Sequence, residues 1–186
     1  LGALHLQLQS LRRGLNAGRA TPEALDLGLE RTINQSARVA KLLDHLLDLS
    51  RATAGKLVIE REEVDLAALA REVIVRLSEM LASAGCRTTL AAPEPVIGCW
   101  DRIRIEQVLT NLLSNAARYA SGAPVEVEVA AVDGTAQLVV RDHGPGIPEA
   151  VKERLFLPFE RARGTHVVGL GLGLYISRQI VAAHGG

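Results

Sequence analysis

Aromatic residues and net charge are both scarce in this sequence. Only 3% of its 186 residues are aromatic although 48% are hydrophobic, so leucine, alanine and valine must supply the core. That balance favours helices and small domains. The 21 basic residues equal the 21 acidic residues in number, so the chain has no overall field. A neutral chain is not drawn to nucleic acid or to an anionic membrane, and we expect no nucleic-acid partner.

Paired cysteines and long apolar runs are also missing. Cys86 and Cys99 form no C-x-x-C pair, so we expect reduced thiols in a cytosolic setting. No stretch reaches the roughly 18 consecutive apolar residues of a membrane span, and no signal peptide is visible. The first residue is leucine and not methionine. We therefore expect a piece of a longer protein, in which membrane contact would come only through segments outside this chain.

Two leucine-rich heptad patterns distinguish residues 1–52 from the rest. The first joins Leu1, Leu4, Leu8, Leu11 and Leu15, and the second joins Leu29, Ile33, Ser36, Ala40, Leu43 and Leu47. Thr21 and Pro22 suit the start of the second helix, so we predict a helical hairpin. One apolar seam per helix cannot close a core, so we expect a homodimer through residues 1–52 that forms a four-helix bundle. The alternative is packing against the chain's own second domain.

The remaining residues alternate between strand and helix patterns. A linker and the first strand are expected over 53–60, the strand pattern itself covering 56–62, and Asp65 is expected to cap a helix ending near residue 84. The other expected elements are strands at 87–90, 96–98, 124–129 and 135–141 and helices at 102–119, 148–155 and 171–183. Because Asp133-Gly134 marks a hairpin between interleaved strands and helices, we expect an α+β fold, with an α/β sandwich of a mixed sheet and helices on one face.

Two asparagines on the helix expected at 102–119 suit a metal and phosphate site. Asn111 and Asn115 are four residues apart, so they share one helix face. An amide oxygen there can ligate magnesium without adding charge, because magnesium prefers a few protein oxygens together with phosphate oxygens and water.

Two glycine-rich segments add features of a nucleotide site. Asp142 ends an apolar strand, where its carboxylate can accept a hydrogen bond from the exocyclic amine of a base. Gly144 and Gly146 let the backbone turn sharply and approach a ligand. The run Gly169-Leu-Gly-Leu-Gly173 precedes an apolar helix, whose first N–H groups form a natural phosphate site. Together with the asparagines, these segments indicate an ATP site.

These motifs, with Phe156-Leu-Pro-Phe159-Glu-Arg161 between them, resemble the N, G1, F and G2 boxes of sensor histidine kinases, which share an ATPase superfamily with type II topoisomerases. The resemblance covers essentially the whole chain and implies a dimerisation hairpin at 1–52 and an ATP-binding domain at 61–186. The ATP-binding residues it implies are Asn111, Asn115, Arg118, Tyr119, Asp142, Gly144, Gly146, Ile147, Phe159, Arg161, Gly169, Leu170, Gly171, Leu172 and Gly173. Asn111, Asn115 and Arg118 are the expected catalytic set, with Asn115 as the Mg²⁺ ligand. Arg118 stands where the family usually carries lysine.

The resemblance also implies a reaction. The γ-phosphoryl group of magnesium-bound ATP would pass to a histidine, and then to an aspartate of a response-regulator receiver domain. The family's acceptor histidine is followed by an acidic residue and a proline, which His5 is not. We therefore expect the acceptor upstream of Leu1, and a chain that as given binds ATP without phosphorylating itself. We expect a cytoplasmic domain, which can belong to an inner-membrane sensor, and further strands after Gly186.

Two other functions are compatible with the motifs. A related superfamily ATPase would hydrolyse ATP, but such enzymes generally carry an acidic base where this chain has the amide of Asn111. A non-catalytic dimerising module would bind nucleotide without transferring phosphate. A nucleotide titration with and without magnesium separates this module from the kinase.

Overall fold

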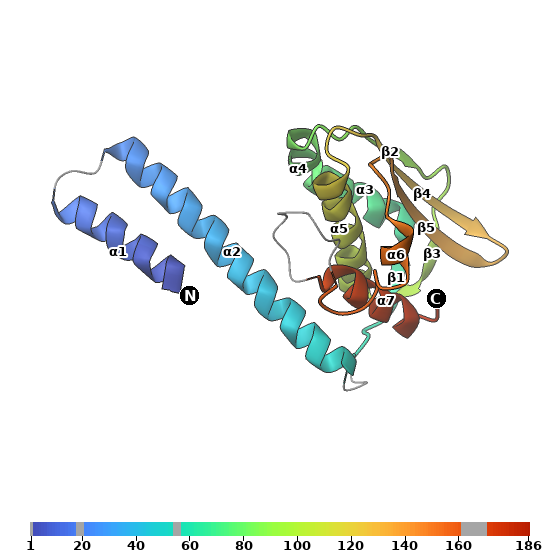
Figure 1. Ribbon diagram of the computed structural model, residues 1–186. Helices are drawn as coiled ribbons and strands as arrows, with labels where there is room; N and C mark the ends of the chain where they lie inside the picture. Colours follow the sequence, from blue (N-terminus) through green and yellow to red (C-terminus); the bar gives the residue numbers. More distant parts are fainter. Residues whose placement is uncertain (1, 18–20, 54–56, 161–170) are drawn as a thin grey trace. The chain divides into compact units, whose positions relative to one another are not determined.

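The computed structural model describes residues 2–17, 21–53, 57–160 and 171–186. The chain divides into two compact units, Leu1–Ser50 and Arg51–Gly186. The elements, in chain order, are α1 (Gly2–Asn16), α2 (Pro22–Thr53), β1 (Glu62–Asp65), α3 (Leu66–Arg76), α4 (Ser78–Ser83), β2 (Thr88–Ala91), β3 (Ile97–Trp100), α5 (Arg102–Tyr119), β4 (Val125–Val132), β5 (Thr135–Asp142), α6 (Glu149–Lys152) and α7 (Gly173–Ala183) (Figure 1). None of the helices in the described ranges is both long enough and apolar enough to cross a membrane.

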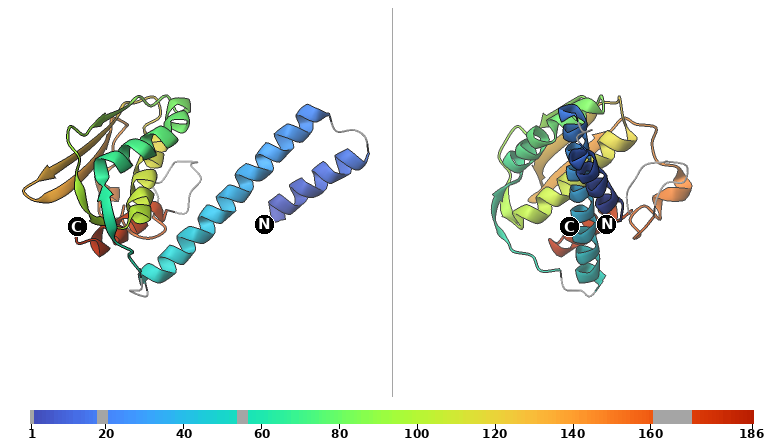
Figure 2. Two further views of the ribbon diagram at one scale, coloured as in Figure 1. Left: turned by 180° about the vertical axis from the view of Figure 1, so that it is seen from behind. Right: turned by 90° about the vertical axis from the view of Figure 1, so that its left-hand side faces the viewer.

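The first unit is the expected helical hairpin, with α1 and α2 side by side (Figure 2). As predicted, α2 begins at Pro22, and the Thr21 hydroxyl accepts a hydrogen bond from the Ala24 N–H at 3.3 Å. A backbone N–H and the Thr21 hydroxyl, in that order of importance, lower the pKa of the exposed Glu23 carboxyl. The chain therefore starts α2 with local polar groups, as a helix N-terminus requires.

The hairpin packs closely at one point and leaves apolar surface elsewhere. A Cβ atom at Gly28 would lie 2.2 Å from Cδ2 of Leu11, so the absent side chain lets the helices approach. Ile33 is 65% exposed, and Leu43 and Leu47 are each 56% exposed. Within the described part of the hairpin, these heptad positions have no covering element.

The described residues of the second unit form the expected mixed sheet and, beside the prediction, a separate two-stranded sheet. β2, β4 and β5 form the mixed sheet, with β2 parallel and β5 antiparallel to β4. β1 and β3 pair antiparallel as a separate two-stranded sheet. The predicted hairpin turn between β4 and β5 is confirmed, since Asp133 and Gly134 have φ angles of 50° and 76°. Positive φ at both central residues matches the right-handed twist of the strands.

The core lies on one face of the mixed sheet. Val125, Val127 and Val129 of β4 are buried, while Glu126 and Glu128 between them are exposed. Helices α3 and α5 both lie on the side of the buried valines (Figures 1 and 2). The alternation along β4 thus decides which face carries α5, the helix expected to hold the asparagines.

The first strand was predicted too early. Residues 57–61 form no strand, and β1 begins at Glu62. The Asp101 carboxylate accepts the Glu60 N–H at 3.0 Å. This N–H therefore bonds to a side chain distant in sequence and not, as the prediction required, to a neighbouring strand. Residues 54–56, the rest of the expected linker, lie outside the described residues, and α2 continues to Thr53.

Three expected helices differ in extent from the prediction. The helix capped by Asp65 is divided into α3 and α4 at Leu77, whose φ and ψ angles are −94° and 3°. α6 covers only Glu149–Lys152. α7 begins at Gly173, two residues after the expected start, because Gly171 has a φ of 69° and cannot continue a right-handed helix.

Candidate functional site

Helix α5 carries four of the predicted site residues, Asn111, Asn115, Arg118 and Tyr119. It covers Arg102–Tyr119, as predicted, and Asp101 caps it by accepting the Arg104 N–H at 3.0 Å. The buried residues Leu109, Leu113 and Ala116 belong to the hydrophobic core and fix the orientation of α5 against it. A helix anchored in this way presents its remaining faces at fixed angles to the neighbouring segments.

Asn111 connects α5 to α7. Its side chain is 6% exposed, and its Nδ2 donates to the Gly173 carbonyl at 3.3 Å and to the Ser177 hydroxyl at 3.4 Å. The Gly173 carbonyl can only accept, so the amide must direct its NH₂ group towards α7. Oδ1 of Asn111 takes no part in these two bonds.

The other predicted residues of α5 lie in its last two turns. Asn115 is half-buried and follows Asn111 by one turn, as the spacing predicted. Arg118 and Tyr119 are exposed at the C-terminal end, where Tyr119 is 40% exposed. From Asn111 to Tyr119 the surroundings therefore change from the interior to the surface.

The Asp142 turn packs against the end of α5. Asp142 closes β5, and its Oδ1 accepts the Gly144 N–H at 3.0 Å. A Cβ atom at Gly144 would lie 2.7 Å from the Cβ of Ala120, the residue after α5, so glycine permits this approach. Gly146 has a φ of 77°, and Ile147 is 47% exposed. The turn is therefore shaped by glycine at two positions, as predicted.

A backbone contact joins the F and G2 segments. The Phe159 N–H donates to the Gly171 carbonyl at 3.1 Å. A Cβ atom at Gly171 would lie 2.4 Å from the Glu160 carbonyl oxygen, so only glycine fits there. Phe159 itself has a φ of 65°, which is rare for a non-glycine residue and is typical of strained functional segments.

The structure describes only some of the predicted residues of the F and G2 segments. Leu172 is 1% exposed and precedes the first residue of α7, Gly173. Arg161, Gly169 and Leu170 lie outside the described residues. The structure thus brings α5, the Asp142 turn, the Phe159–Gly171 contact and the start of α7 into one connected set.

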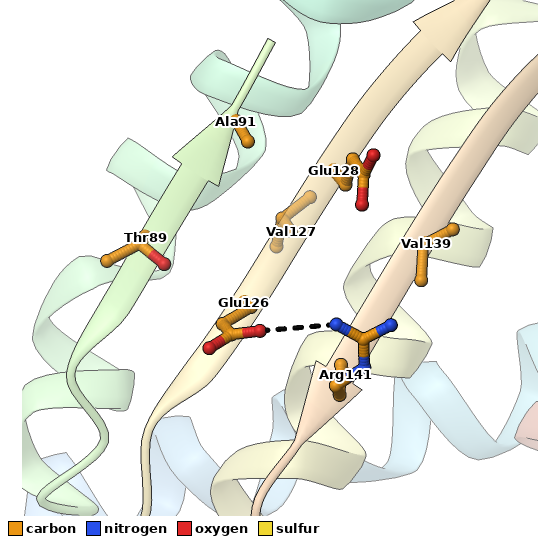
Figure 3. Close-up of a pocket in the computed structure, with 7 residues that line it drawn as sticks. All are labelled: Thr89, Ala91, Glu126, Val127, Glu128, Val139 and Arg141. Carbon is orange, nitrogen blue, oxygen red and sulfur yellow. Dashed lines mark hydrogen bonds and ion pairs between the residues drawn. The ribbon is translucent and has the colours of Figure 1, made fainter.

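A separate hollow lies on the exposed face of the mixed sheet (Figure 3). It has a volume of about 130 Å³ and is lined by Thr89, Ala91, Glu126, Val127, Glu128, Val139 and Arg141. An ion pair of 3.4 Å joins Arg141 to Glu126 across it. None of the predicted site residues lines this hollow, so we do not include it in the candidate site.

Ser177 and His184 make contacts at this site and were not among the predicted site residues. Ser177 is 5% exposed and contacts Asn111, and its spacing of four from Gly173 was the available signal. His184 accepts the Asp101 N–H at 3.0 Å through Nε2, a contact across 83 positions that no local pattern indicates. In the described ranges, no group of three His, Cys, Asp or Glu side chains is arranged to hold a metal.

Comparison with known proteins gives matches over both units. The family described as "Histidine kinase-, DNA gyrase B-, and HSP90-like ATPase" matches residues 100–186. The "Signal transduction histidine-protein kinase BaeS" of Escherichia coli (strain K12) is 31% identical over 190 residues, which cover 100% of this chain and 39% of BaeS. The chain therefore spans well under two thirds of this curated relative.

Solved structures agree with this match. The catalytic domain of histidine kinase ThkA is 30% identical with a TM-score of 0.60, covering 67% of this chain and 81% of that domain. Full-length ShkA in complex with AMPPNP is 27% identical with a TM-score of 0.74, covering 89% of this chain and 35% of ShkA. ThkA in complex with the response regulator protein TrrA is 24% identical with a TM-score of 0.65, covering 100% of this chain and 53% of that one, and shows the fold alone.

Proposed function

This chain belongs to the sensor histidine kinases and forms part of their catalytic core, and we propose that it binds magnesium–ATP and donates the γ-phosphoryl group to a histidine. The observation that carries the proposal is the position of Asn111. A buried amide holds the start of α7 through its NH₂ group, at the place where a hydrolase would need a base. An amide cannot take a proton from water, so this site favours transfer over hydrolysis.

Asn115 is the proposed magnesium ligand. It lies on the exposed side of Asn111 along one face of α5, so an ion held there can share its coordination with phosphate oxygens. The residues present fit such an ion, because neutral amide oxygens leave the phosphates to supply the negative charge. Magnesium bound there would neutralise charge on the phosphates during transfer. Asn111 Oδ1, which can only accept, is proposed to face the same ion, and the Arg118 guanidinium is proposed to contact the phosphates.

Asp142 is the proposed reader of the adenine base. Its Oδ1 already accepts the Gly144 N–H, so Oδ2 remains to accept a hydrogen bond from the exocyclic amine. Gly144, Gly146 and Ile147 would form the surrounding turn, and the absent side chain at Gly144 fits the close approach to α5. Tyr119 is proposed to pack beside the base, because an aromatic ring at a half-exposed position can cover a planar ligand.

The remaining predicted residues are assigned to the phosphates and the lid. α7 has eleven residues, and the N–H groups at its start suit phosphate binding. We propose this role for the run Gly169, Leu170, Gly171, Leu172 and Gly173. We propose that the residues from 161 to 168 form a lid over the nucleotide, that Phe159 anchors this lid segment, and that Arg161 reaches the terminal phosphate. Support for the lid comes from the Phe159–Gly171 bond, which joins the lid segment to the phosphate-binding run.

Two competing functions make different predictions. A related ATPase would release phosphate without an acceptor, and a non-catalytic module would bind nucleotide only. Magnesium-dependent binding without release of inorganic phosphate supports the kinase over the ATPase. Transfer to the hairpin helices of a chain extended upstream, with an added acceptor histidine, separates the kinase from the non-catalytic module.

The hairpin is the proposed dimer and partner surface. Residues 1–52 would pair with a second copy as a four-helix bundle, since their heptad positions include highly exposed apolar side chains. We propose residues 53–60 as the linker region and 61–186 as the ATP-binding domain. The solved ThkA relative was crystallised with a response regulator protein, and we propose a receiver domain as the partner of this chain too. Because ATP is the phosphate donor, the proposed setting is cytoplasmic.

The test is the substitution Asp142→Asn. The side-chain oxygen can still accept the Gly144 N–H, but the other position then becomes an NH₂ group that faces the donor of the base. Two donors cannot pair, so we expect ATP affinity to fall by at least about tenfold while the fold is retained. Calorimetric titration with AMPPNP and magnesium measures the affinity, and circular dichroism checks the fold. Unchanged affinity would remove the base-reading role.

A further inference from the structure

Residues 60 and 61, which precede β1 within the second unit, form hydrogen bonds near both helices of the proposed site. The Glu60 N–H donates to Oδ2 of Asp101 at 3.0 Å. The Arg61 guanidinium donates to the Ala183 carbonyl at 3.2 Å. Asp101 is 7% exposed and caps α5, whereas Ala183 is the last residue of α7. Residues 60 and 61 therefore bridge the beginning of one helix and the end of the other.

His184 adds a direct contact between the two helices, and its hydrogen bonds define its tautomer. Its Nδ1 lies 2.8 Å from the Ile180 carbonyl oxygen, and its Nε2 lies 3.0 Å from the Asp101 backbone nitrogen. A carbonyl can only accept and a backbone N–H can only donate, so Nδ1 must carry the proton and Nε2 must be the acceptor. A neutral ring in this tautomer links the last turn of α7 to the first residue before α5.

The two helices are thus joined at two levels. Asp101 and His184 form the first contact, and Asn111 with Gly173 forms the second. From the first to the second contact, α5 rises by ten residues and α7 by eleven in the opposite direction, or about 15 Å and about 16 Å. These rises match, so both contacts can be made only in one register of α7 along α5. The Asn111 bonds of 3.3 and 3.4 Å are long, and apolar packing is not directional, so neither fixes that register alone.

We propose that His184 and Asp101 are positioning residues for the nucleotide site. They hold α7 in the register that places Gly173 against Asn111, and Asp101 also holds the backbone of Glu60 within the same unit. The inference rests on the proposed nucleotide-binding function. It assigns roles to two residues outside the motifs that contact nucleotide.

The experiment compares His184→Phe with His184→Gln in the full chain. Phenylalanine keeps a ring but removes both hydrogen bonds, whereas the glutamine oxygen can still accept the Asp101 N–H. We expect magnesium–AMPPNP affinity to fall about tenfold in His184→Phe, as for residues that orient ligand-holding side chains, and to return to within about threefold in His184→Gln. Affinities are corrected for the folded fraction measured by urea unfolding.

Asp65→Ala is the matched control for Asp101→Ala. Asp65 also caps a helix, by accepting the Ala67 N–H at 2.9 Å, and also accepts a distant backbone N–H, that of Val96, at 3.2 Å. Its helix, α3, carries no proposed site residue. We expect both variants to unfold at lower urea concentration, but only Asp101→Ala to bind nucleotide more weakly. Equal affinities in the two variants would overturn the positioning role.

Two spectroscopic measurements do not depend on nucleotide binding. Nitrogen chemical shifts of the wild-type His184 ring should show protonated Nδ1, and protonated Nε2 would overturn the inference even if every variant failed to fold. The Asn111 side-chain amide resonances should move in His184→Phe and not in Asp65→Ala. If the wild type binds no nucleotide, the proposed function fails, while these resonances still decide whether His184 sets the position of Asn111.

Discussion

Replacing Gly171 with alanine should damage the proposed site through one close backbone contact. Gly171 has a φ of 69°, and a Cβ atom there would lie 2.4 Å from the Glu160 carbonyl oxygen. Gly134 has a similar φ of 76°, but a Cβ atom there meets nothing within 4 Å. Alanine at either position adopts a left-handed conformation, so the pair isolates the effect of the contact from that of the backbone angle.

The magnitude follows from the two terms. The left-handed conformation of a non-glycine residue lowers the unfolding free energy by about 1–2 kcal/mol. Alanine also reduces the conformational entropy of the unfolded chain, which raises the unfolding free energy by about 0.4–1 kcal/mol. Gly134→Ala should therefore destabilise the protein by about 1 kcal/mol. In Gly171→Ala the Glu160 carbonyl must also retreat by about 0.6 Å to reach even a 3.0 Å contact. That displacement breaks the adjacent Phe159–Gly171 bond, at a further cost of about 1 kcal/mol.

Urea unfolding and magnesium–AMPPNP titration together measure this difference. We expect Gly171→Ala to lose about 2 kcal/mol of unfolding free energy, or, if the segment yields locally, to bind nucleotide at least about fivefold more weakly. Gly134→Ala should bind nucleotide like the wild type. If the two variants have the same stability and the same affinity, the contact between Gly171 and Glu160 does not shape the site, and the reasoning is refuted.

The other predictions concern the metal and the dimer. Asn115→Ala removes the proposed magnesium ligand, so nucleotide affinity should become nearly independent of magnesium in calorimetric titration. If magnesium still raises the affinity of this variant, Asn115 is not the magnesium ligand. Ile33→Glu places a charge on the exposed apolar seam of the hairpin and should shift the chain from dimer to monomer at micromolar concentration, as measured by light scattering. Asn34 is adjacent to Ile33 but lies off the seam, so the control Asn34→Glu should leave the dimer intact. A wild-type chain that is monomeric at the same concentration would contradict the four-helix bundle.

Local signals predicted the parts of the fold that depend on few neighbouring residues. The bounds of α5 were predicted correctly because its cap, Asp101, and its apolar repeat lie within one stretch of sequence. The β4–β5 hairpin was predicted for the same reason, since Asp133-Gly134 specifies its own turn. The start of α2 at Pro22 follows from Thr21 as the cap and from Pro22 as the first helical residue. In each case the determining residues lie within a few positions of the element.

Partners distant in sequence explain the errors. Residues 57–61 alternate like a strand, but the Asp101 carboxylate takes the Glu60 N–H, so β1 begins only at Glu62. The pairing of β1 with β3 outside the mixed sheet likewise depends on where the chain returns after α4. A periodic pattern shows that a segment is half-buried, and it does not show which group will hold its backbone.

The sequence by itself determined the chemical groups of the candidate site. The amides of Asn111 and Asn115, the carboxylate of Asp142 and the glycine-rich turns are recognisable by type and order, because nucleotide chemistry requires them at short, fixed spacings. Only the tertiary structure decided how those groups are held. The Asn111 amide is oriented by α7, and the register of α7 is set by His184 and Asp101, whose contact spans 83 positions. Hydrogen bonds between distant segments depend on the packing of whole helices, and no local pattern encodes that packing.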